Sequence, residues 1–67
     1  MKRIGRRVRI KDELPEFNGR TGTIIDGFRD LNGWIMYRVR LDWPVTMSLS
    51  GHLVTEDIWR TDLLKTI

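Results

Sequence analysis

The fold is decided by residues 5–25, which read GRRVRIKDELPEFNGRTGTII. In the first part of this stretch, Val8 and Ile10 alternate with charged residues, which is the period-two pattern of a strand with one buried face. A polar loop follows, and a β-branched run then begins beside two glycines that lie three residues apart. Glycines at such a place predict a sharp turn and a close approach between neighbouring backbones. We therefore predict one strand at about residues 6–11 and a second at about residues 21–28.

The order of residues in the same stretch resembles the KOW motif, which begins many small SH3-like β-barrels. The matching positions are glycines, aliphatic residues and one aromatic residue: Gly5, Val8, Ile10, Phe17, Gly19, Gly22 and Ile24. The resemblance implies an all-β fold, a single SH3-like barrel of five strongly bent antiparallel strands with a short 3-10 turn before the last strand. It places the barrel at residues 5–67 and leaves residues 1–4 as a flexible basic tail. A positive φ angle is expected in the glycine turn, so a side chain at Gly22 is expected to cost more than about 1 kcal/mol.

The residues after the motif are expected to supply the remaining strands. Asn32-Gly33 is a strong turn signal, so a hairpin leads into a strand at residues 34–42. Trp43-Pro44 is expected to end that strand, because proline has no amide donor and restricts the residue before it. The elements expected next are a less regular strand at residues 45–54, one turn of 3-10 helix at residues 55–59 and a closing strand at residues 62–67. The residues expected inside the barrel are Val8, Ile10, Ile24, Tyr37, Val39, Leu41, Leu53 and Leu64, with Trp59 closing one end.

Length and composition limit the class of protein. A chain of 67 residues makes one small domain, and the absence of cysteine excludes disulfides and thiolate metal sites. One histidine, His52, makes a histidine-based zinc site improbable, so no metal and no cofactor are expected. No apolar run has the length of a membrane span, and no apolar segment follows the basic N-terminus. These features favour a cytoplasmic protein that does not enter a membrane.

Positive charge is concentrated near the N-terminus. The formal net charge is +3, yet the first eleven residues contain six lysines and arginines and no acid. Arginine forms forked hydrogen bonds to phosphate, so a basic strand face is a candidate for contact with a nucleic-acid backbone. The candidate contact residues are Arg3, Arg6, Arg7, Arg9, Lys11, Arg20, Arg38 and Arg40, with Trp34 as a platform for base stacking. The competing interpretation is a solvated strand face whose charges pair with the acidic loop at residues 12–16.

Two binding functions therefore remain open. The KOW resemblance implies contact with RNA or DNA, although the acids of the first loop argue against phosphate binding through that loop. The alternative is an SH3-like protein-interaction or self-assembly module, because tryptophan and arginine dominate protein interfaces. A basic strand beside an acidic loop also favours a homo-oligomer. The candidate interface residues are Trp34, Met36 and Trp43.

An enzyme is the remote alternative. Ser48, Ser50 and His52 are close in sequence, but no motif joins them into a nucleophile and a base, so no catalytic residue is assigned. Type II dihydrofolate reductases are SH3-like chains of similar size that act as oligomers. The present chain resembles their general pattern but lacks their Val-Gln-Ile-Tyr strand, and reads Met47-Ser48-Leu49-Ser50 in the nearest region.

Overall fold

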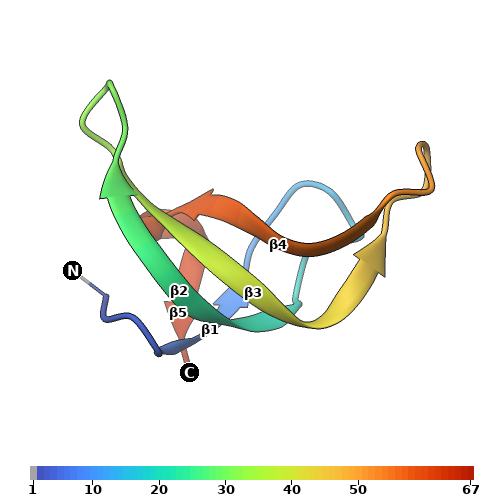
Figure 1. Ribbon diagram of the computed structural model, residues 1–67, viewed down its shortest axis with the longest axis horizontal. Helices are drawn as coiled ribbons and strands as arrows, with labels where there is room; N and C mark the ends of the chain where they lie inside the picture. Colours follow the sequence, from blue (N-terminus) through green and yellow to red (C-terminus); the bar gives the residue numbers. More distant parts are fainter. Residues whose placement is uncertain (1) are drawn as a thin grey trace.

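The computed structural model describes residues 2–67, in which the regular structure is almost all β (Figure 1). Five strands and one short 3-10 helix follow one another in the order β1 (Arg7–Ile10), β2 (Thr21–Arg29), β3 (Ile35–Thr46), β4 (Leu53–Arg60), η1 (Thr61–Leu63) and β5 (Leu64–Thr66). All strand pairs are antiparallel, and the order in the sheet is β4-β3-β2-β1-β5. The predicted all-β class, the five strands and the 3-10 turn before the last strand are confirmed.

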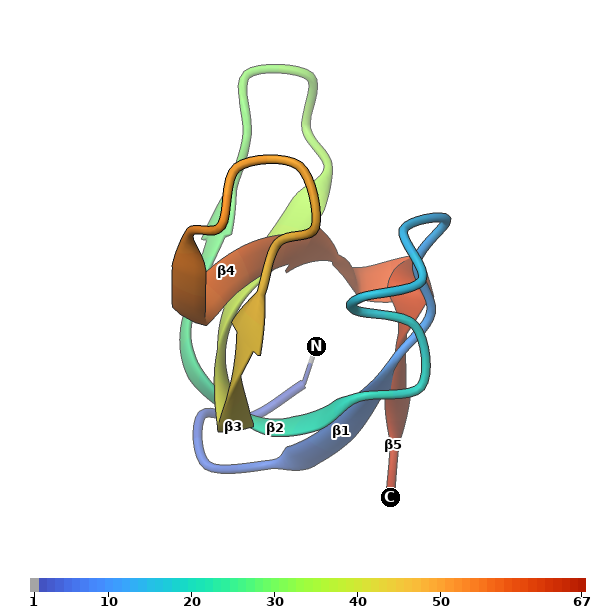
Figure 2. The ribbon, with the colours of Figure 1, turned by 90° about the vertical axis from the view of Figure 1, so that its right-hand side faces the viewer.

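The sheet curls strongly around one face. Figure 2 shows the strands wrapped about a common interior, with η1 joining the end of β4 to β5. No ladder between β4 and β5 is present among residues 2–67, so these two strands are the edges of the described sheet. Over residues 2–67 the sheet is therefore curled, and no β4–β5 ladder closes it into a barrel.

The core lies on the concave side and is built from alternate residues of the strands. Its buried side chains are Val8, Ile10, Phe17, Ile24, Tyr37, Val39, Leu41, Val45, Trp59 and Leu64. The ring of Trp59 packs edge-on against Phe17 at 5.3 Å between centroids, and its Nε1–H donates to Asp12 Oδ2 at 2.7 Å. Trp59 is thus buried, as predicted for the residue that closes one end. The first loop contributes both partners, which fixes the loop against the core.

Leu53 was expected inside and is instead 65% exposed. It lies at the start of β4, opposite Thr46 at the end of β3. The last β2 residue paired with this part of β3 is Gly22, opposite Leu41, so the end of the β3–β4 hairpin extends beyond the third strand. In the same segment Val45 and its partner Val54 pack on the core, so the alternation of the strands places Leu53 and Thr46 on the outer face.

Strand β3 continues through Trp43-Pro44, so the predicted break is wrong. Pairing of β3 with β4 is interrupted between Arg40 and Val45, where β3 carries extra residues and the ladder shifts register. On the other side, the paired segment of β2 does not reach Pro44. A proline is tolerated there because no partner strand needs its missing amide donor.

The 3-10 turn was expected at residues 55–59 and lies at Thr61–Leu63. Residues 55–59 belong to β4, where Trp59 pairs with Tyr37 and Asp57 pairs with Val39. Pairing with β3 provides hydrogen bonds for the backbone N–H and C=O groups of these residues. It therefore prevails over the local sequence signal for a helix start, a threonine followed by acids. The strand expected at residues 45–54 is likewise divided between β3 and β4, with a tight loop between them. Two hydrogen bonds of 2.9 Å close this loop, from Met47 N–H to the His52 carbonyl and from Gly51 N–H to the Met47 carbonyl.

The two glycines of the motif have different roles. Gly19 has a φ angle of +81°, as expected for the turn before β2. Gly22 does not have a positive φ angle, so that prediction is wrong. A Cβ atom at Gly22 would lie 2.5 Å from the Arg40 carbonyl oxygen and 2.7 Å from Val39 Cγ1. Glycine is needed there because β2 and β3 approach closely, which agrees with the predicted close approach of backbones.

Candidate functional site

Arg7, the first residue of β1, is neutralised within the sheet. Its guanidinium forms a forked pair with the Asp42 carboxylate on β3, and one of the two bonds, from Nη2 to Oδ2, is 2.6 Å long. The hydroxyl of Thr21 donates to the same carboxylate at 2.5 Å. These hydrogen bonds lower the pKa of Asp42 to about 2, and the bond to Asp42 raises the pKa of Arg7. Arg7 therefore has an internal anion and is a poor candidate for contact with an external phosphate.

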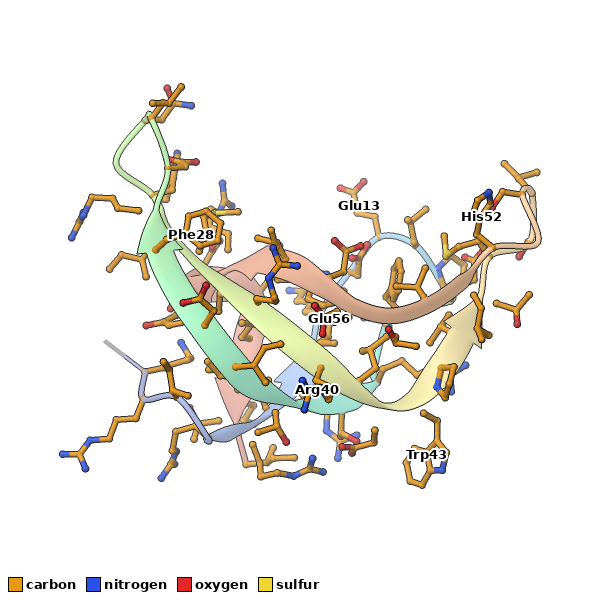
Figure 3. All side chains as sticks on the ribbon, viewed as in Figure 1. Glu13, Phe28, Arg40, Trp43, His52 and Glu56 are labelled. Atoms are coloured by element: carbon orange, nitrogen blue, oxygen red, sulfur yellow. The ribbon has the colours of Figure 1, made fainter. Side chains whose placement is uncertain are left out.

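The two arginines of β3 also have an acidic neighbour. Glu56 on β4 lies opposite Arg40, and its carboxylate is 4.0 Å from Arg40 Nε and 3.5 Å from Arg38 Nη1. Figure 3 shows Arg40 and Glu56 on neighbouring strands at the centre of the sheet. Glu56 therefore offsets one of the two positive charges in this part of the sheet.

A different group of cations has no acidic partner. The group, called here the basic cluster, consists of Arg9, Lys11, Arg20 and Lys65. None of the four has a carboxylate within 4.0 Å in the described part of the chain, residues 2–67. Arg9 on β1 lies directly opposite Lys65 on β5, and opposite Thr21 on its other side. The strand pairing thus holds two positive side chains as direct neighbours.

Backbone carbonyls orient the two arginines of the basic cluster. Arg9 Nη1 donates to the Gly19 carbonyl at 3.3 Å, and Arg20 Nε donates to the Glu16 carbonyl at 3.0 Å. These bonds hold the guanidinium groups beside the first loop and leave most of their donors free. The positive φ of Gly19 turns the chain so that both arginines reach the same loop end.

Two surface hollows lie beside the basic cluster and share Arg9 in their walls. The first has a volume of about 380 Å³ and includes Lys11 and Lys65 in its lining. The second has a volume of about 210 Å³ and is lined by Arg9, Gly19, Arg20, Thr21 and Trp43. Asp62 also borders the first hollow, but its carboxylate accepts bonds of 2.5 and 2.8 Å from Arg60, which lower its pKa. The acid in the lining of this hollow is therefore already paired with Arg60.

Arg3 and Arg6 lie before β1, beside a third hollow of about 290 Å³ that they share with Lys2 and Thr66. The Lys2 backbone N–H donates to the Tyr37 hydroxyl at 2.6 Å, and Lys2 Nζ donates to Thr61 Oγ1 at 2.8 Å. Of the expected tail at residues 1–4, Met1 lies outside the described residues. Thr66 directly follows Lys65, so these arginines lie toward the far end of the β1–β5 pair from the first loop.

The two exposed tryptophans have different environments. Trp34 is 49% exposed, but the guanidinium of Arg60 lies 4.4 Å from the centroid of its ring. Trp43 is 69% exposed and lines the second hollow with Arg9 and Arg20. Figure 3 shows the indole of Trp43 projecting away from the sheet. Trp34, the predicted stacking platform, is thus occupied by a cation of the same chain, and Trp43 is the aromatic residue beside the basic cluster.

Met36, the third candidate interface residue, lies on the same side of the sheet as Trp34. It is half-buried and is paired with Phe28 on β2 and with Arg60 on β4. Figure 3 shows Phe28 near the β2–β3 hairpin, far along the sheet from Trp43. Trp34 and Met36 therefore share a neighbourhood around Arg60, and Trp43 does not belong to it.

Lys65 is a member of the basic cluster that the sequence reasoning missed. The sequence did contain a signal for Lys65. Side chains of successive residues in a strand point to opposite faces, and Leu64, the residue before Lys65, was expected to be buried. That alternation places Lys65 on the outer face, next to the basic first strand. The pairing of the first and last strands of the sheet is the additional fact that the prediction needed.

Acids of the first loop are used to hold the structure together. Asp12 accepts hydrogen bonds from Trp59 Nε1–H and, at 2.8 Å, from the Leu14 N–H. Glu16 accepts from the Ser48 hydroxyl at 2.7 Å and from its N–H at 3.1 Å, which lowers the pKa of Glu16. The carboxylates of Asp12 and Glu16 are therefore engaged by other groups, while Asp12 and Glu13 border a further hollow with Lys11.

Ser48, Ser50 and His52, to which no catalytic role was assigned, make hydrogen bonds with other partners. The Ser48 hydroxyl donates to Glu16, and the Ser50 hydroxyl accepts from the backbone N–H of His52 at 3.2 Å. Within residues 2–67, no hydrogen bond joins the His52 imidazole to either serine side chain. Over the same residues, no group of three acidic, histidine or cysteine side chains could hold a metal ion, and no helix is long and apolar enough to cross a bilayer.

Comparisons with known proteins returned no match to a family model, to a curated protein or to a solved structure.

Proposed function

We propose that the chain is a small nucleic-acid-binding module that contacts the phosphate backbone through the basic cluster. The observation that carries the proposal is the pairing of Arg9 with Lys65, neither of which has a carboxylate within 4.0 Å among residues 2–67. Like charges directly opposite on neighbouring strands destabilise a sheet. An external anion would relieve that repulsion.

Phosphate suits the arrangement of the cluster. The two guanidinium groups can form forked hydrogen bonds to phosphate oxygens, and the lysines add point charges at the rim of the hollows. Arg3 and Arg6 extend the positive surface along β1, beyond Lys65. Backbone contacts of this kind provide most of the affinity of sequence-independent binding.

A fold inference accompanies this proposal. We infer that the curled sheet is an SH3-like barrel and that residues 5–25 are a KOW-like motif. The inference is supported by the five-strand order, the turn at Gly19, the close approach at Gly22 and the 3-10 turn that joins the two edge strands.

The proposal is tested by the salt dependence of binding. Fluorescence anisotropy with a labelled single strand is measured between roughly 50 and 200 mM salt for the wild type and for a chain carrying Arg9→Gln and Lys65→Gln. If all four cations of the cluster neutralise phosphates, log K falls with log salt at a slope on the order of −3, and the double variant should show about half that slope.

A matched control removes the same amount of charge elsewhere. Arg29 lies at the end of β2 and donates to the Gly33 carbonyl at 2.9 Å, and Arg38 lies near Glu56. The pair Arg29→Gln and Arg38→Gln should leave the slope close to that of the wild type. Equal slopes for the wild type and both variants would contradict the proposal.

A second candidate is self-association through the outer face near the β2–β3 hairpin. The observation that favours it is the group formed by Phe28, Met36 and Trp34, of which Phe28 is 42% exposed and Trp34 is 49% exposed. Aromatic residues and methionine are enriched at protein interfaces. Light scattering at micromolar concentration tests this candidate: a dimer mass that Met36→Lys abolishes would support it, and a mass near 8.0 kDa would refute it.

A further inference from the structure

We infer that the ligand of the basic cluster is single-stranded nucleic acid, with one base stacked on the indole of Trp43 and the flanking phosphates held by Arg9 and Arg20. This inference rests on the proposed function and adds to it the class of nucleic acid. The juxtaposition that carries it is the second hollow, where the exposed indole and two unpaired guanidinium groups share one wall.

The backbone around Trp43 allows its side chain to leave the sheet. Trp43 lies in the part of β3 where the pairing with β4 is interrupted. It also lies beyond Leu41, the last β3 residue that pairs with β2, so the chain can bend outward at this point. Pro44 restricts the residue before it to extended conformations, which limits the directions that the indole can take. A backbone that is already restricted loses less entropy when a base stacks on the indole.

Within the described residues, no aromatic ring or cation of the chain stacks on the ring of Trp43. Among residues 2–67, the aromatic and cation–π contacts involve Phe17 with Trp59, Lys2 with Tyr37 and Arg60 with Trp34. Leaving a large aromatic surface in water forgoes the free energy of burial that the other tryptophans gain in whole or in part. A ligand with a planar ring and neighbouring negative charges would bury the exposed face of the indole. The same ligand would also accept hydrogen bonds from Arg9 and Arg20.

Single strands fit this geometry and duplexes do not. In a duplex the base faces are covered by their stacked neighbours, so the indole of Trp43 reaches a face only by unstacking a step. A flexible single strand can turn one base onto the ring while its phosphates follow the positive surface. Stacking of this kind tolerates any base, because every base has a π face.

The test compares Trp43→Ala, Trp43→Phe and the wild type for binding a short labelled thymidine homopolymer and a duplex of equal length. Trp43→Ala should weaken binding to the single strand by roughly 5- to 150-fold, which corresponds to the loss of one stacked base. It should change duplex binding by less than about twofold, and Trp43→Phe should retain most of the single-strand affinity. Trp34→Ala, which removes a second exposed tryptophan, should leave both affinities near those of the wild type.

The other outcomes separate this inference from the proposed function. Equal weakening of single-strand and duplex binding, or no effect of Trp43→Ala while Arg9→Gln with Lys65→Gln still weakens binding, would overturn base stacking and leave the phosphate-binding proposal intact. No binding of either probe by the wild type at about 50 mM salt would overturn both. A dimer of the wild type that Trp43→Ala dissociates, with no nucleic-acid binding, would instead assign the indole to a contact between copies of the chain.

Discussion

Replacing Gly22 with alanine perturbs a point where β2 and β3 approach closely. The new Cβ atom would lie 2.5 Å from the Arg40 carbonyl oxygen, which belongs to the backbone of β3 and cannot rotate away. It would also lie 2.7 Å from Val39 Cγ1, in the centre of the core. Inserting one methyl group into a packed site costs about 1–3 kcal/mol through forced shifts of backbone and side chains. A domain of 67 residues has a total stability of roughly 3–10 kcal/mol, so the loss should be large.

Gly19 provides the comparison, because its requirement for glycine has a different cause. A Cβ at Gly19 meets no atom within 4 Å, but the φ angle of +81° is unfavourable for most side chains. Alanine there should cost about 1–2 kcal/mol, and asparagine should cost less, since asparagine tolerates this conformation. At Gly22 the order should reverse, with asparagine worse than alanine because it is larger.

Urea unfolding followed by tryptophan fluorescence gives the free energy of unfolding for the four variants, with Trp59 as a buried reporter. We expect Gly19→Asn to have a higher free energy of unfolding than Gly19→Ala, and Gly22→Ala to have a higher one than Gly22→Asn. If Gly22→Asn is more stable than Gly22→Ala, the steric explanation for Gly22 is wrong.

Two further perturbations test the contacts that hold the loops and the outer face. Trp59→Phe removes the 2.7 Å hydrogen bond to Asp12 and part of a buried ring. It should lower the free energy of unfolding in urea titrations by about 1–3 kcal/mol. An unchanged value would show that the hydrogen bond contributes nothing to stability. Asp42→Asn should make the free energy of unfolding depend less on pH in the acid range. The pKa of Asp42 is about 2 in the folded chain and roughly 3.9 in the unfolded chain. The carboxylate therefore stabilises the fold above about pH 4, and this stabilisation is lost as the pH falls toward 2. Thermal unfolding of the wild type and of Asp42→Asn across this range checks the sign, and parallel curves would contradict it.

Much of the fold follows from local patterns in the sequence. The alternation of Val8 and Ile10, and of Tyr37, Val39 and Leu41, correctly assigned the buried faces of the first and third strands, because a strand with one buried face repeats every two residues. The errors arose where pairing with distant strands overrides local preference. Pro44 lies inside β3, and residues 55–59 extend β4, because their neighbours in the sheet determine which backbone groups need partners.

The site was less predictable, because ion pairs depend on which side chains the folded sheet brings together. Sequence alone grouped Arg7 with Arg9, although the fold gives Arg7 a forked partner in Asp42, a residue 35 positions away. It also selected Trp34 over Trp43, since both flank the same strand and only the fold shows that Arg60 covers Trp34. The charge density of the first strand was visible in the sequence, but which of its charges are neutralised was not.

The central claim is that nucleic acid binds at the basic cluster, and chemical-shift mapping tests it most directly. Backbone amide and tryptophan indole N–H shifts of nitrogen-labelled protein are followed while a short thymidine homopolymer is added at low salt. The account predicts that the largest changes fall on Arg9, Lys11, Gly19, Arg20, Lys65 and the indole of Trp43, with little change at Phe28, Met36 or the indole of Trp34. Changes confined to the latter group, or small changes spread evenly over every basic residue, would contradict the account.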